Sequence, residues 1–110
     1  MSAFEMSPLL DGKGLRLAGE LDLASAPRLT EALLDVAWPA AEVHLDLADL
    51  SFLDSSGLRV ILELARSRGF DGSVVLLHPS KAVMRTFEIT GIDEHPGIEI
   101  RHWSAEPMTA

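Results

Sequence analysis

The stretch from Asp46 to Leu62, DLADLSFLDSSGLRVIL, changes from strand periodicity to helix periodicity at one short turn. Apolar and polar residues alternate from Val43 to Leu47, which is typical of a strand with one buried face. Apolar residues then recur three or four positions apart from Leu58 to Ala65, as on one face of a helix. The pattern therefore predicts a strand, a tight turn at Asp54-Ser55-Ser56-Gly57, and a helix.

Two serine hydroxyls thus lie at a helix N-terminus, where free backbone N–H groups and the helix dipole favour an anion. A phosphate added there would be tolerated by the fold, and it would change the surface charge by about −1.5 to −2. The alternative interpretation is structural, because Ser and Asp are the commonest N-cap residues and any α/β domain can carry this turn. Ser55 and Ser56 are both candidate caps, and if one caps the helix the other is freer to point outward.

The remaining sequence predicts a hairpin followed by alternating helices and strands. The expected strands are Phe4–Leu10, Leu15–Glu20, Ser73–Leu77 and Ile98–Ile100, and the expected helices run from Ser25-Ala26-Pro27 to Trp38-Pro39, from Ser56 to Arg68, and from Lys81 to Thr90 with Ser80 as N-cap. This order predicts an α/β domain whose sheet is mostly parallel after an antiparallel hairpin. On the middle helix, either Val60 or Leu62 could remain partly exposed for a partner; the alternative is burial of both.

Composition restricts the class of partner. The chain has 110 residues, no Cys and a formal net charge of −8. We expect one domain over residues 1–110 with a short tail from about residue 102, and no disulfide. The negative charge argues against a nucleic-acid partner and favours a basic protein. Since no signal peptide or long apolar stretch is visible, we expect a cytoplasmic protein without a membrane span.

The sequence gives little support to enzymatic function or to a cofactor. Its four His residues have no metal-ligand spacing, and a Gly-rich phosphate loop and a Gly-x-Ser-x-Gly elbow are both absent. Asp46, Asp49 and Asp54 invite comparison with an acidic magnesium pocket. The better interpretation places Asp46 on a strand, Asp49 in a loop and Asp54 beside a helix N-terminus. We therefore expect no catalytic residue, no metal and no cofactor.

A second motif, Gly19-Glu20-Leu21-Asp22, precedes the first helix. In this order, the two motifs resemble the STAS domain family, specifically the bacterial anti-sigma factor antagonists, and the resemblance runs from about Leu15 to Gly91. It implies a single STAS-like domain with a mixed, mostly parallel sheet of four to five strands and helices packed on it. In place of the family's long last helix we expect a short terminal turn or none, because Pro107 limits any helix in the tail.

The resemblance also implies a function and a site. In the family the first serine of the turn is phosphorylated by a partner kinase that is also the anti-sigma factor, and this role maps onto Ser55. Unphosphorylated, the chain would bind that factor and release a sigma factor, and a phosphatase would reactivate it. The partner-binding residues expected around Ser55 are Asp22, Asp54, Ser56, Gly57 and Arg59. The alternative is a STAS subunit of another assembly, such as a lipid-transport or stress-signalling complex.

Overall fold

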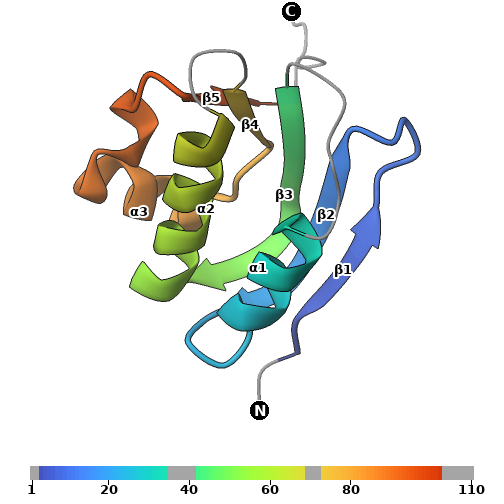
Figure 1. Ribbon diagram of the computed structural model, residues 1–110. Coiled ribbons are helices and arrows are strands. Elements are labelled where there is room, and N and C mark those ends of the chain that lie inside the picture. Colours follow the sequence, from blue (N-terminus) through green and yellow to red (C-terminus); the bar gives the residue numbers. More distant parts are fainter. Residues whose placement is uncertain (1–2, 35–41, 69–72, 103–110) are drawn as a thin grey trace, which may run out of the picture.

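The computed structural model describes residues 3–34, 42–68 and 73–102, which form one sheet with three helices (Figure 1). The five strands are β1 (Glu5–Pro8), β2 (Gly14–Leu21), β3 (Glu42–Leu53), β4 (Ser73–Leu77) and β5 (Ile98–Arg101). The helices are α1 (Ala26–Leu34), α2 (Ser55–Arg68) and α3 (Lys81–Thr90), followed by a short 3₁₀ turn, η1 (Ile92–Glu94). The fold class expected from the sequence is confirmed.

The strands lie in the sheet in the order in which they occur in the chain, β1-β2-β3-β4-β5. β1 pairs antiparallel with β2, and every later pair is parallel. Because parallel strands are joined by right-handed crossovers and each crossover moves to the next strand, the three helices come to the same face of the sheet.

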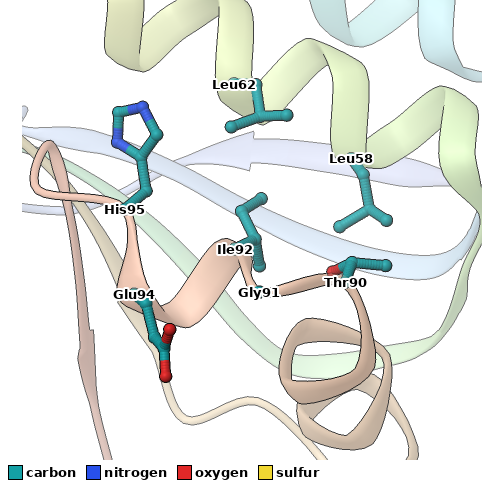
Figure 2. A pocket seen from close by; sticks show the side chains of 7 residues that line it. All are labelled: Leu58, Leu62, Thr90, Gly91, Ile92, Glu94 and His95. Atoms are coloured by element: carbon teal, nitrogen blue, oxygen red, sulfur yellow. The ribbon is translucent and has the colours of Figure 1, made fainter.

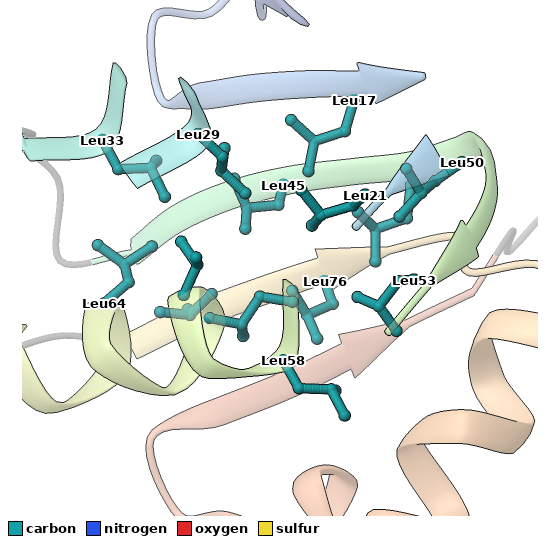
Figure 3. Close-up of a cluster of buried hydrophobic side chains, with 14 of the residues drawn as sticks. Leu17, Leu21, Leu29, Leu33, Leu45, Leu50, Leu53, Leu58, Leu64 and Leu76 are labelled. Carbon is teal, nitrogen blue, oxygen red and sulfur yellow. The ribbon is translucent and has the colours of Figure 1, made fainter. Parts of the chain in front are cut away.

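All three helices share one apolar core with that face, and leucines dominate it (Figure 3). On β3, Val43, Leu45 and Leu47 are fully buried, whereas the intervening polar residues are half-buried. The alternation read from the sequence therefore selects the face that the helices cover.

The opposite face of the sheet carries polar side chains. Glu42 accepts a hydrogen bond from His44 at 3.0 Å and pairs with Arg101 at 2.9 Å, and Arg101 also pairs with Glu99 at 2.6 Å. The hydrogen bond from His44 and the charge of Arg101 together hold the pKa of Glu42 below its ordinary value, although partial desolvation opposes them. No helix in the described part of the chain is long and apolar enough to cross a membrane.

Several elements differ from the sequence prediction. β3 continues through Asp49 to Leu53, so Asp49 lies on a strand, where it pairs with Arg16 at 2.7 Å, and not in a loop. β1 is shorter than expected, and η1 was not expected. The expected end of the first helix at Trp38-Pro39 and the tail beyond His102 lie outside the described residues.

Candidate functional site

The two sequence motifs meet at the carboxyl ends of β2 and β3. Leu21 and Leu53 are paired in the sheet, and the N–H of Asp54 donates to the carbonyl of Leu21 at 3.1 Å. This hydrogen bond joins the residues that precede Asp22 and Ser55 in the chain. The strand end at Asp22 therefore lies close to the turn.

The cap of α2 is Asp54, and neither candidate serine takes that role. The Oδ1 atom of Asp54 accepts hydrogen bonds from the backbone N–H groups of Ser56 at 2.8 Å and Gly57 at 3.3 Å. Ser55 and Ser56 are the first two residues of the helix, which begins at Ser55 rather than at Ser56. The prediction of a serine cap was wrong, because the preceding carboxylate already reaches the free N–H groups.

The two serines differ in their exposure to solvent. Ser55 is exposed and Ser56 is half-buried, and the structure records no hydrogen bond for either hydroxyl among the described residues. Ser80, by contrast, is half-buried and its hydroxyl accepts from the Val83 N–H at 3.2 Å, which confirms it as the N-cap of α3. Of these three hydroxyls, the Ser55 hydroxyl is the one that is both exposed and without a structural role.

Gly57 is buried, and its missing side chain makes room within the molecule. A Cβ atom at this position would lie 2.8 Å from Cγ and Cδ2 of Leu21 and 3.3 Å from Cδ1 of Leu53. Gly57 therefore lets the first turn of α2 pack directly on the ends of β2 and β3. Contact of its backbone with a partner stays a prediction.

Asp22 organises the loop between β2 and α1. Its Oδ1 atom accepts from the N–H groups of Ala24 at 3.0 Å and Ser25 at 3.1 Å, and it lies 3.0 Å from the Ser25 hydroxyl. Partial desolvation raises the pKa of the Asp22 carboxyl, but the hydrogen bonds from Ser25 and Ala24 outweigh it, and the pKa lies below its ordinary value.

Ser25 was missed as a member of this site. It is the one buried polar residue recorded in the described part of the chain, with 3% of its surface exposed. Its Oγ atom accepts from the Asp22 N–H at 2.9 Å and lies 2.9 Å from the Glu20 carbonyl oxygen. The spacing Asp-x-x-Ser before a helix was the available signal, since both residues satisfy backbone groups of turns.

The exposed side of α2 continues the site away from the turn. Arg59 is exposed, Leu62 is half-buried, and Val60 is buried with 7% of its surface exposed. Val60 faces α1, where it lines a small cavity with Leu33. Of the two apolar residues considered for partner contact, only Leu62 remains partly exposed.

Two exposed apolar side chains flank the site, and the sequence analysis did not single them out. Leu23 follows Asp22 and is 76% exposed, and Phe52 precedes Leu53 and is 49% exposed. A hydroxyl at the positive end of a helix, with carboxylates and apolar side chains around it, is suited to modification and to protein contact. Within the described residues, no group of three or more His, Cys, Asp or Glu side chains could hold a metal ion.

Comparisons with known proteins connect the chain with one family. A family model described as "Mlab, STAS domain" matches residues 10–101. The anti-sigma-B factor antagonist of Bacillus subtilis (strain 168) is 36% identical over 83 residues, which cover 73% of this chain and 74% of that protein. The anti-sigma-B factor antagonist of Listeria monocytogenes is 35% identical over 92 residues, covering 82% of this chain and 79% of that protein.

Solved structures share the fold. An anti-sigma factor antagonist from Mycobacterium paratuberculosis has a TM-score of 0.73 and 21% identity, covering 92% of this chain and 86% of that one. The anti-sigma factor antagonist SpoIIAA in its unphosphorylated form has a TM-score of 0.63 and 25% identity, covering 89% of this chain and 87% of that one. The phosphorylated form of SpoIIAA, from Bacillus, has a TM-score of 0.62 and 22% identity, covering 89% and 90%.

Proposed function

Since this chain belongs to the STAS domain family, we propose that it is an anti-sigma factor antagonist whose binding is switched by phosphorylation of Ser55. The observation that carries the switch is the exposed Ser55 hydroxyl at the first residue of α2, beside an aspartate that already caps the helix. The curated relatives named anti-sigma-B factor antagonists support the partner class.

The unphosphorylated chain docks on an anti-sigma factor through the surface around Ser55, and a sigma factor is released. Asp22, Asp54 and Ser56 lie at the rim of this surface, and Arg59 extends it by one helical turn from Ser55. The net charge of −8 favours the encounter with a partner whose overall charge is positive.

Phosphorylation transfers the γ-phosphoryl group of ATP to the Ser55 oxygen, which loses its proton, and ADP leaves. The kinase is the anti-sigma factor itself, and in the cytoplasm a phosphatase hydrolyses the phosphoserine with water, which releases inorganic phosphate and restores the hydroxyl. The phosphate adds about −1.5 to −2 charge beside the carboxylates of Asp22 and Asp54. Docking is then blocked by bulk and by repulsion from acids of the partner, while the helix N-terminus tolerates the new charge without refolding.

In this proposal the chain is a regulatory module and carries out no catalysis of its own. The second candidate, a STAS subunit of another assembly such as a lipid-transport complex, draws on the family model, whose description names Mlab. A neighbouring gene for a transporter, rather than for a kinase-like anti-sigma factor, would favour this second candidate.

The test combines phosphorylation with binding. The chain is incubated with ATP and each purified anti-sigma factor of the same genome, and the modified residue is mapped by mass spectrometry. We expect phosphate on Ser55 and none in the Ser55→Ala variant, whereas Ser56→Ala, which keeps the Ser55 hydroxyl, should still carry phosphate on Ser55. Phosphate found only on Ser56 or only on Ser80 would refute the assignment.

Ser55→Asp should weaken binding more than tenfold, that is by over about 1.4 kcal/mol. Its melting temperature should equal or exceed that of the wild type, because an acid at a helix N-terminus stabilises by roughly 0.3–1 kcal/mol. If the variant melts at a much lower temperature than the wild type, its lost binding would reflect unfolding, and this result would contradict the switch.

A further inference from the structure

An apolar cavity of about 290 Å³ lies between α2 and the corner formed by the end of α3 and η1 (Figure 2). Leu58 and Leu62 form its α2 wall, and Ile92 faces them from η1. Thr90 and Glu94 are exposed residues that border the cavity, with the Glu94 side chain extending outward from η1, and His95 closes the end beside Leu62. Pockets for small molecules span roughly 300–1,000 Å³, so this cavity suits one or two side chains better than a larger ligand.

The walls of the cavity are held in place by the backbone. Gly91 ends α3 at φ 79°, and its N–H donates to the Phe87 carbonyl, which turns the chain sharply into η1. The Nδ1 atom of His95 accepts from the Gly97 N–H at 3.0 Å, which fixes the ring against the end of the cavity. A preformed pocket of this kind binds a side chain with little ordering cost.

The cavity is continuous with the proposed switch surface. Ser55, Leu58 and Leu62 follow one another at spacings of three and four residues, which places them along one side of α2. A partner that covers the Ser55 hydroxyl therefore reaches the cavity within the next two turns of the same helix.

The charge at the rim indicates the chemistry of the occupant. Glu94 is exposed, and no ion pair is recorded for it among the described residues. An apolar floor with one unpaired carboxylate at its rim matches an apolar side chain with a basic neighbour. Such buried anchors, surrounded by polar contacts, supply most of the binding energy of protein interfaces.

We infer that this cavity receives an apolar side chain of the anti-sigma factor, with the Glu94 carboxylate paired to a basic residue beside it. The inference rests on the proposed function and adds a second anchor to the Ser55 turn. The Ser55 turn provides the switch, and the cavity provides affinity that does not depend on the hydroxyl.

The test measures affinity by calorimetry for the purified anti-sigma factor that binds the wild-type chain in the phosphorylation experiment. Leu62→Glu places a charge in the cavity, and Thr90→Trp fills the cavity from an exposed position. Each should weaken binding at least tenfold, equivalent to about 1.4 kcal/mol. The matched control is Leu10→Glu, at a fully exposed leucine in the turn between β1 and β2, beside the opposite edge of the sheet from β5. It should leave the affinity unchanged.

The outcomes separate the two proposals. Wild-type affinity in Thr90→Trp, with a normal melting temperature, overturns the cavity but leaves the Ser55 switch standing. Absence of binding by the wild-type chain to every anti-sigma factor of the genome overturns both. If Leu62→Glu lowers the melting temperature, the affinity of Thr90→Trp alone decides whether the cavity takes part in binding. A wild-type dimer in sedimentation that Leu62→Glu dissociates would make a second copy the occupant and overturn the inference.

Discussion

Replacing Asp54 by alanine and by asparagine separates its role as a helix cap from its charge. The alanine variant loses the acceptor that serves the N–H groups of Ser56 and Gly57, at 2.8 and 3.3 Å. Loss of an N-cap costs roughly 0.5–2 kcal/mol. Loss of a negative charge at a helix N-terminus costs roughly a further 0.3–1 kcal/mol. We therefore expect alanine to lower the free energy of unfolding by about 1–2 kcal/mol.

Asparagine keeps an acceptor oxygen at the same position and ranks with aspartate as an N-cap. Its cost should be limited to the charge, about 0.3–1 kcal/mol. For a domain of this size 1 kcal/mol shifts the melting temperature by roughly 5 °C, so calorimetry at pH 7 and low salt should resolve the two variants.

Equal melting temperatures for the alanine and asparagine variants would refute the capping argument. The asparagine variant also tests the expected contact of Asp54 with the partner. Lost affinity in a variant whose fold is intact would show that the carboxylate itself takes part in binding.

Two further predictions concern the packing and the loop of the site. Gly57→Ala should lower the free energy of unfolding by about 1 kcal/mol, because the new Cβ atom would meet the fully buried Leu21. Crowding in a core costs roughly 1–3 kcal/mol, and replacing a glycine inside a helix returns up to about 1 kcal/mol. An increase in the urea midpoint would contradict this prediction. Asp22→Asn should lower stability at neutral pH. The pKa of the folded Asp22 lies below its ordinary 3.8, so its contribution is present above about pH 4 and is lost as the pH falls through the folded value. The difference between Asp22→Asn and the wild type should therefore narrow at pH 3, and a constant difference would refute the assignment. If Asp22→Asn keeps full partner affinity, Asp22 belongs to the loop and not to the binding surface.

Local signals in the sequence were sufficient for the elements with clear ends. β4 is a continuous apolar run, and α3 has Ser80 at its start and Gly91 at its end, so both were found with the bounds that the structure shows. These features depend on residues within a few positions of one another, which is the range over which capping and periodicity act.

The remaining differences come from contacts between distant segments. β3 runs on through Asp49 because β2 pairs with it through two shifts of register, and no local pattern encodes that pairing. Asp54 and the two serines are equally good caps by residue type, so only the path of the backbone selects the aspartate. The burial of Val60 depends on where α1 packs, which the helical pattern of α2 does not contain.

The consecutive order of the strands has a consequence for synthesis on the ribosome. Each strand of the sheet finds a neighbour that has already been translated, since the order is β1-β2-β3-β4-β5. The recorded hydrogen bonds of Asp54 connect it to Leu21, Ser56, Gly57 and Leu58, and none of them reaches beyond Leu58. The N-terminal part of the chain leaves the ribosome first during synthesis. All residues that the Ser55 turn needs are therefore present while β4, α3 and β5 are still being made, whereas the cavity beside Leu58 and Leu62 also needs the segment from Thr90 to His95.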